Sequence, residues 1–192
     1  MRNGIESPQK LPWRWGTDTG LQAPPYLQRE PASSFTLAAR AVYTAADTQS
    51  LYLWLCQLRR APYSYDWIDN FFRQSPRTPD PSLTNLSIGQ TVMTIFDLVD
   101  FQPHRYLTLK MKPGLPTRIF GSLVVHYSIV TEEHAQVLRG DLWMASTGPY
   151  FGRLRRFLLA WGDIIMMRKQ LLTLTALAEQ TDMEQRLTEQ RH

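Results

Sequence analysis

The longest uninterrupted helical pattern in the chain follows Pro149. From residue 150 to about residue 180 there is no proline, and the apolar residues recur with the period of an α-helix. A helix of about 30 residues would span roughly 45 Å. An amphipathic helix of this length needs an extended apolar partner, and a sheet can supply one.

The residues before this helix predict that sheet. Closely spaced strands without intervening helices favour antiparallel meander pairing, and the predicted strands cover residues 91–99, 105–112, 118–131 and 135–145. An earlier segment, 34–45, alternates in polarity and predicts a first strand. After this strand a helix is predicted, with Asp47 as its N-cap and Pro62 as the residue that stops it. Residues 63–72 predict a second short helix. The expected fold class is α+β, with a curved antiparallel sheet wrapped around a long C-terminal helix.

The chain divides into three segments by composition. Residues 1–33 are rich in proline and show no period, residues 34–181 form the predicted domain, and residues 182–192 form a polar tail. The first segment also contains Trp13, Trp15 and Tyr26, which are costly to leave in water. It therefore either lies as an extended strap against the domain or is disordered, and the sequence leaves both readings open.

Charge and cysteine content exclude several functions. The net charge of +4 is scattered, so no nucleic-acid partner is expected, although weak contact with anionic membrane surfaces stays open. Cys56 is the only cysteine, and its apolar surroundings favour a buried, inert thiol. No signal peptide or transmembrane segment is predicted, which makes a cytoplasmic protein the default. The four histidines lack the spacing of a metal site, so no metal and no cofactor are expected.

Two stretches resemble the SRPBCC superfamily, which includes the START lipid-binding domains, the birch-pollen allergen fold and the polyketide cyclases. They are WLCQLRRAPYSYDWIDN at residues 54–70 and GDIIMMRKQLLTL at residues 162–174. With the strand order, the resemblance covers about residues 34–180 and points to an uncharacterised bacterial subgroup. It implies a helix-grip fold around a hydrophobic cavity, which relatives use for lipids, polyketides, hormones or quinones. It does not choose between binding and catalysis.

In relatives of this type the first helices form a lid over one end of the cavity. On that basis Tyr63, Tyr65 and Trp67 would line its mouth, with Asp66 beside them. The alternative is a rigid corner in which Asp66 and Asp69 cap backbone amides. These two aspartates could also share a helix face as an acid/base pair, but this spacing is common.

The final helix holds a basic residue within an apolar face. Helical geometry groups Arg168 with Trp161 and Ile165. The other residues of this face are Leu154, Phe157, Leu158, Ile164, Leu171, Leu172 and Thr175. A guanidinium there needs a partner. Arg168 would pair with Asp66 or Asp69, orient a ligand carbonyl or carboxylate in the cavity, or be displaced to solvent at the helix edge.

The opposite face of this helix is also partly apolar, which predicts cover on both sides by the N-terminal strap or by a second subunit in a homodimer. It carries Leu159, Met166, Met167, Leu174 and Leu177 together with Asp163 and Gln170.

His126 and Tyr127 are neighbours in a predicted strand, so one must point inward and the other outward. Either could face the ligand, although a lone histidine here is more often a structural residue. The sequence contains no phosphate loop, nucleophile elbow or dinucleotide fingerprint.

Three functions stay open. The leading hypothesis is a binder or carrier of a small hydrophobic ligand that is lipid-, polyketide- or quinone-like. The second is a polyketide cyclase or aromatase, with Arg168 binding a carbonyl and Tyr65, Asp66 or His126 moving protons. The third is a protein-interaction module with a vestigial cavity.

Overall fold

The computed structural model describes residues 5–6, 11, 13–16, 23–29, 35–64, 74–132, 135–145 and 151–190. Within these ranges it describes every side chain except those of residues 5–6, 29, 116, 119–120 and 151–164.

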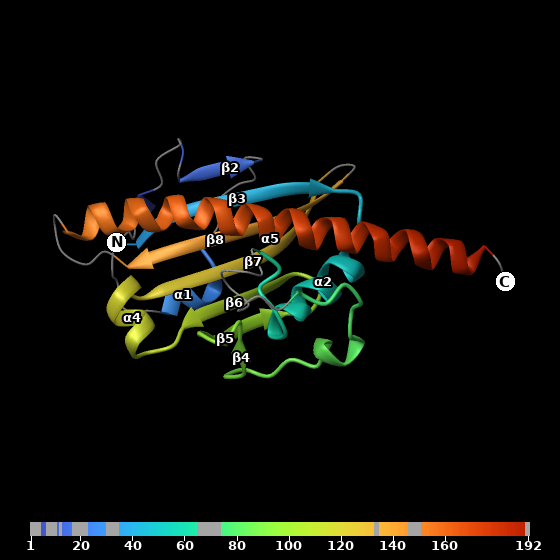
Figure 1. The fold of residues 1–192 in the computed structure, drawn as a ribbon, viewed down its shortest axis with the longest axis horizontal. Helices are drawn as coiled ribbons and strands as arrows, with labels where there is room; N and C mark the ends of the chain where they lie inside the picture. Colours follow the sequence, from blue (N-terminus) through green and yellow to red (C-terminus); the bar gives the residue numbers. More distant parts are fainter. Residues whose placement is uncertain are drawn as a thin grey trace.

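Among the described residues, eight strands form one sheet (Figure 1). Its order is β1-β3-β8-β7-β6-β5-β4, and β2 also pairs with β3. The pairs are antiparallel except that β1 and β2 run parallel to β3. The bounds are β1 Ile5–Glu6, β2 Arg14–Gly16, β3 Phe35–Thr44, β4 Thr91–Val92, β5 Phe96–Gln102, β6 Tyr106–Met111, β7 Leu123–Glu132 and β8 Ala135–Ala145.

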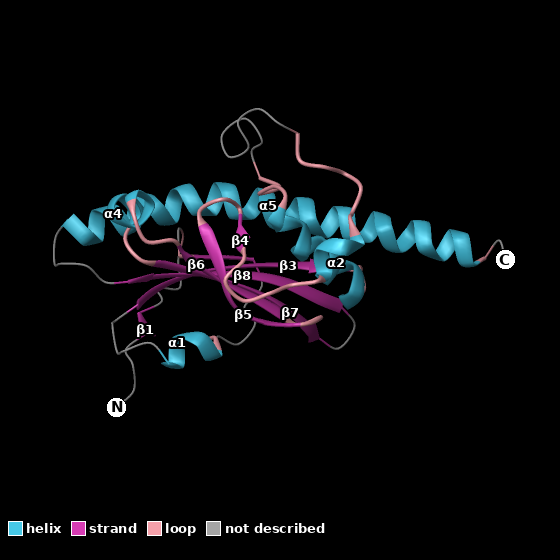
Figure 2. Cartoon of the chain, turned by 90° about the horizontal axis from the view of Figure 1, so that it is seen from below, coloured by secondary structure: helices cyan, strands magenta, loops and turns pink. Residues whose placement is uncertain are grey.

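The helices lie on both sides of this sheet. The long helix α5 and the helix α2 cover one face, and the short helix α1 lies against the other (Figure 2). The bounds are α1 Pro25–Arg29, α2 Thr48–Cys56, α4 Leu115–Phe120 and α5 Phe151–Glu189, with 3-10 turns at Gln57–Arg59 and Pro81–Thr84. The 39 residues of α5 span about 58 Å, so its C-terminal end extends past the sheet (Figure 1).

Polar contacts hold α2 against α5. The Asp47 side chain accepts a hydrogen bond from the Ser50 amide at 2.6 Å, which confirms the predicted N-cap. The Asp47 amide donates to Asp182 of α5 at 2.6 Å, and the Trp54 indole donates to Thr181 at 2.9 Å. These bonds lie at the rim of a core in which Trp54 is 1% exposed. Apolar burial provides most of the stability here, and the polar bonds orient α2.

The described parts of the N-terminal segment belong to the folded domain. The carbonyl of Trp13 accepts hydrogen bonds from the Ala39 amide at 2.7 Å and from the Arg40 guanidinium at 2.8 Å. Gly16 has φ +91, and a Cβ there would lie 1.8 Å from the Ala41 carbonyl oxygen. Only glycine allows β2 to approach β3 this closely.

The structure confirms the predicted α+β fold with a first strand, a helix after it, antiparallel strands and a long final helix, and 135–145 is a strand with the predicted bounds. The second short helix predicted at 63–72 lies almost wholly outside the described residues. Two predicted strands are wrong in part. Residues 91–99 are interrupted because Met93 and Thr94 adopt positive φ values of 47 and 66. The start of 118–131 belongs to α4, a helical turn that lies between Gly114 and Gly121. The final helix also continues through the predicted polar tail to Glu189.

Candidate functional site

The two faces of the sheet have different chemistry. Side chains alternate along a strand, and cross-strand partners share a face. A Cβ on Gly140 would lie 2.8 Å from the Met167 sulfur, so Gly140 and its partner Tyr127 face α5. We call this side the inner face. His126 and Asp141 are paired partners one residue away, so they occupy the opposite side, which we call the outer face.

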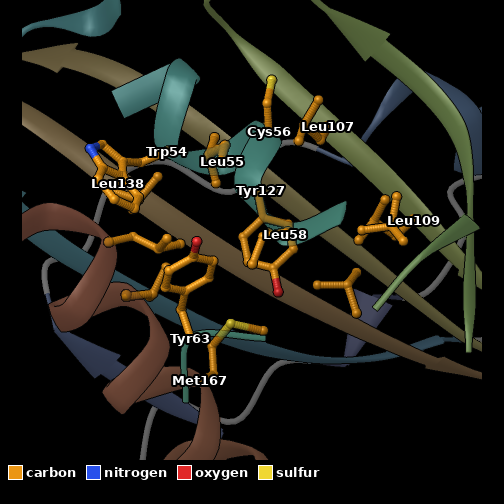
Figure 3. Packing of buried hydrophobic residues seen from close by; sticks show 14 of the residues in the cluster. Trp54, Leu55, Cys56, Leu58, Tyr63, Leu107, Leu109, Tyr127, Leu138 and Met167 are labelled. Atoms are coloured by element: carbon orange, nitrogen blue, oxygen red, sulfur yellow. The ribbon is translucent and has the colours of Figure 1, made fainter. Parts of the chain in front are cut away.

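The inner face is an apolar wall opposite the middle of α5. Figure 3 shows Tyr63, Tyr127 and Met167 lying together in this core with side chains from α2 and β6. The buried apolar side chains that α5 adds are Met167, Leu171, Leu174, Leu177 and Ala178. Any polar group within this core needs a hydrogen-bond partner.

Gln170 is the polar centre of the inner face. Its side-chain oxygen accepts a hydrogen bond from the Tyr127 hydroxyl at 2.6 Å, and both residues are buried. Its amide nitrogen donates to the Pro62 carbonyl and also contacts the Met93 sulfur at 3.5 Å. A thioether is a weak acceptor, so this amide would gain from a carbonyl oxygen in its place.

The two loops that contact Gln170 have unusual backbone conformations. Tyr63, next to Pro62, has φ +54, and Met93 and Thr94 have φ +47 and +66. Non-glycine residues in this region cost about 1–3 kcal/mol each and cluster at ligand sites and switches. Tyr63 is 1% exposed and meets Trp54 edge-on with ring centroids 5.8 Å apart.

The predicted burial of the α5 face that holds Arg168 is wrong in part. Leu171 on that face is buried, but Arg168 points to solvent, which was the third alternative for this residue. Ile165 is 54% exposed and Arg168 is exposed, whereas Met167 and Gln170 on the face called opposite are buried. The Arg168 guanidinium lies 5.2 Å from the centre of the Trp15 ring, which is a cation–π distance. Arg168 and Ile165 are therefore not in contact with Tyr127 or Gln170.

The remaining predicted site residues are divided between the faces or lie outside the described residues. Tyr63 and Tyr127 lie on the inner side, while His126 is on the outer face and cannot act on the same ligand. The residues and side chains outside the described part are Tyr65, Asp66, Trp67, Asp69 and the side chain of Trp161.

The outer face contains a buried ionisable cluster. The Arg139 Nε donates to Asp141 at 2.9 Å, and both side chains are buried. His126 is 7% exposed, and its Nδ1 is 2.9 Å from the Thr108 hydroxyl. Burial raises the pKa of Asp141 to about 6, although the Arg139 guanidinium opposes this. Burial is the larger cause that lowers the pKa of His126 to about 4, and the positive charge of Arg139 lowers it further.

Helix α1 lies over another part of the outer face. Leu27 packs with Leu37, Val124 and Trp143 in a second apolar cluster. The Lys110 ammonium donates to the Tyr26 hydroxyl at 2.8 Å. The polar cluster and this apolar patch together account for the strong burial of both faces of the central strands.

Sequence reasoning missed Gln170 and Met93 as site residues. Helical geometry places Gln170 on the face opposite Arg168, and its position there among Met166, Met167 and Leu174 is the signal for its burial. Met93 had no signal, because its contact with Gln170 depends on the turn between β4 and β5.

Within the described residues, no group of three or more His, Cys, Asp or Glu side chains is placed to hold a metal ion. In the same part of the chain, none of the helices is long and apolar enough to span a membrane.

This element order, with a long final helix across one face of an antiparallel sheet, defines the helix-grip class. The fold implied by the SRPBCC resemblance is thereby confirmed.

No protein-family model matches the sequence, and no curated protein matches it in a sequence search. Among solved structures, the chain is similar to the di-domain ARO/CYC StfQ from the steffimycin biosynthetic pathway, with 13% identity, a TM-score of 0.49, and 77% of this chain and 52% of that chain covered. It thus spans about half the length of StfQ.

A protein from Mesorhizobium loti shows 13% identity and a TM-score of 0.47, over 76% of this chain and 98% of that chain. Norcoclaurine synthase from Thalictrum flavum shows 9% identity and a TM-score of 0.47, over 80% of this chain and 99% of that chain. These likenesses carry no information on ligand or reaction.

Proposed function

We propose that the chain binds a small hydrophobic molecule between the inner face of the sheet and α5, and that Gln170 orients it. The ligand would have an apolar body and one carbonyl oxygen, as in lipid-, polyketide- or quinone-like molecules. The observation that carries this proposal is the buried Gln170 amide, which contacts the weakly accepting Met93 sulfur at 3.5 Å.

The surroundings of Gln170 favour an uncharged acceptor. Its described hydrogen-bond partners are a tyrosine hydroxyl, a proline carbonyl and a thioether, all of them neutral. Arg40 is a buried cation on the inner face, and its guanidinium donates to the carbonyls of Trp13 and Ala39 rather than to Gln170. A carboxylate beside Gln170 would lose its hydration, whereas a ketone, ester or quinone oxygen loses less. An apolar wall with few polar groups that fix orientation is typical of small-molecule sites.

The loops at Tyr63 and Met93 provide the way in. Both hold left-handed backbone at non-glycine residues, so movement away from Gln170 would release strain while exposing apolar surface. A ligand would replace the lost apolar contacts, and its oxygen would take the place of the Met93 sulfur. Ligand binding and loop opening are then coupled.

A cyclase or aromatase activity stays a hypothesis. The sheet separates His126 from Tyr127, so proton transfer at the inner face would depend on Tyr127 and on Tyr65 or Asp66, which lie outside the described residues. The cytoplasmic location also stays a prediction.

The first test combines native mass spectrometry of protein purified from cells with a probe titration. We expect a stoichiometric apolar adduct that is lost on denaturation. After its removal, menadione, a small naphthoquinone, should quench tryptophan fluorescence with a saturable curve. Loss of the Gln170 contact in Gln170→Leu should weaken menadione binding by about twofold to tenfold, because one buried hydrogen bond is worth about 0.5–1.5 kcal/mol.

A matched pair of variants separates the two faces. Tyr127→Phe removes the hydroxyl that holds Gln170, and Tyr106→Phe makes the same change on the outer face. We expect weaker menadione binding only in Tyr127→Phe. The proposal would be overturned by a clean mass together with unsaturable quenching in the wild type, or by equal effects of the two variants.

A further inference from the structure

Tyr52 is a second buried donor in the inner-face core. It lies on α2 and is 3% exposed, and its hydroxyl makes no hydrogen bond of good geometry with any described residue. The polar group that acts on this hydroxyl is the buried Cys56 thiol, one helical turn further along α2. Sulfur is a weak acceptor, so the hydroxyl would gain from an oxygen in its place.

The Tyr52 hydroxyl keeps its proton. Burial raises the pKa of Tyr52, and the neighbouring Cys56 adds to the rise. A neutral phenol can donate to a ligand oxygen, but it has no positive charge with which to hold an anion. Gln170 has the same character, because its neutral amide donates toward the Met93 sulfur. Tyr52 and Gln170 are therefore two buried, neutral donors that each face a sulfur atom.

Left-handed backbone accompanies both donors. The described non-glycine residues with positive φ are Tyr63, Met93, Thr94 and His104. The first three lie in the loops that contact Gln170. The His104 ring lies 5.0 Å from the Tyr52 ring, in the exposed turn between β5 and β6. Backbone of this kind clusters at ligand sites and switches, so each donor has such a turn beside it.

The two donors lie at different places along the same apolar core. In Figure 3, Cys56 and Leu107 lie at one end of the core, and Tyr127 lies nearer its middle. Leu107 on β6 pairs with Tyr127 on β7, whose hydroxyl bonds to Gln170. The donors are therefore about one to two strand spacings apart, which is about 5–10 Å.

Leu58 lies in this core and is linked to the Met93 loop. The Met93 amide donates to the Leu58 carbonyl at 3.2 Å. Movement of Met93 away from Gln170, as proposed for ligand entry, would therefore release Leu58 as well. The apolar body of a ligand would then take the place of the Leu58 side chain between the two donors.

We propose that the ligand of the inner face has two carbonyl oxygens at opposite ends of its apolar body, and that the Tyr52 hydroxyl donates to the second one. This inference rests on the proposed function, in which Gln170 binds the first. A bicyclic para-quinone or diketone has this form. A fatty acid does not, because it has a charged carboxylate at one end and no polar atom at the other.

Isothermal titration calorimetry with two probes tests the second contact. Menadione has two carbonyl oxygens, and α-tetralone has a similar bicyclic skeleton with one. We expect Tyr52→Phe and Gln170→Leu each to weaken menadione binding by about twofold to tenfold, which is the effect of one buried hydrogen bond. The single oxygen of α-tetralone reaches one donor at a time, so only one of the two variants should weaken its binding.

Three controls separate a ligand contact from a structural role. Tyr52→Phe removes a hydroxyl that has no good partner, so it should not lower the stability of the ligand-free protein in denaturant unfolding. Tyr106→Phe on the outer face should leave the binding of both probes unchanged. In the infrared spectrum of bound menadione, both carbonyl bands should lie below those of free menadione in the wild type, and only one should do so in Tyr52→Phe.

The inference is overturned if Tyr52→Phe leaves menadione binding unchanged while Gln170→Leu weakens it; the proposed function would then stand with one polar contact. It is also overturned if both variants weaken α-tetralone as much as menadione. A ligand-free Tyr52→Phe protein that is less stable than the wild type would overturn it too, because the hydroxyl would then have a structural role. If the wild type binds neither probe, the proposed function fails and this inference fails with it.

Discussion

The outer face should contribute two opposing pH dependences to stability. His126 and Asp141 are cross-strand partners, with Arg139 bound to Asp141. The pKa of Asp141 rises from 3.8 to about 6 on folding, so the folded state holds this proton more tightly. The contribution of Asp141 to stability therefore falls as pH rises from about 4 to about 6.

His126 has the reverse sign. Its pKa falls from 6.5 to about 4 on folding, so the unfolded chain holds this proton more tightly. Its contribution to stability is complete above about pH 6.5 and is lost as pH falls toward 4. One unit of pKa difference corresponds to about 1.4 kcal/mol, so each group contributes about 3 kcal/mol across the same range. In the wild type the two contributions nearly cancel.

Single substitutions should remove the cancellation. When the pH falls from 7 to 4, the unfolding free energy of His126→Gln should rise by about 3 kcal/mol relative to that of the wild type. The reason is that, of the two groups, only Asp141 titrates in this variant. Asp141→Asn should lose about 3 kcal/mol over the same interval. Denaturant unfolding at pH 4, 5, 6 and 7 measures these differences. For Asp141→Asn only the change of unfolding free energy with pH is compared, because this substitution also removes the carboxylate that binds Arg139 and so lowers stability at every pH. If His126→Gln follows the wild-type pH curve, the reasoning is wrong.

Two further predictions concern the core. Gly140→Ala should destabilise the protein by about 1–3 kcal/mol, because the new methyl would lie 2.8 Å from the Met167 sulfur. Denaturant unfolding measures this cost, which should be smaller when Met167 is also replaced by alanine. Cys56 should resist iodoacetamide at pH 8 in the folded protein and react after denaturation, because burial raises the pKa of its thiol to about 12; fast labelling of the native chain, followed by mass spectrometry, would contradict this.

Local patterns in the sequence identified the elements whose formation depends on residues close to them in the chain. The alternation of residues 135–145 and the N-cap at Asp47 both depend on neighbouring residues, and the structure confirms both. The absence of helices among the strands favoured antiparallel pairing, which β5 to β8 show. These features sufficed to predict the helix-grip order.

The candidate site depended on contacts between distant residues. Helix α5 carries two apolar stripes, and periodicity alone does not distinguish the one that meets the sheet. The fit of Met167 against Gly140 belongs to the buried side, and it leaves Arg168 and Ile165 outward. The same choice turns Gln170 inward to Tyr127 and Met93.

The sequence by itself therefore determined β3, α2, β6, β8 and the final helix and their order, because hydrophobic period, capping and turns act over a few residues. Only the tertiary structure decided which face of each element is buried. That choice depends on the shape of a surface assembled from residues more than a hundred positions apart, such as Pro62 and Gln170.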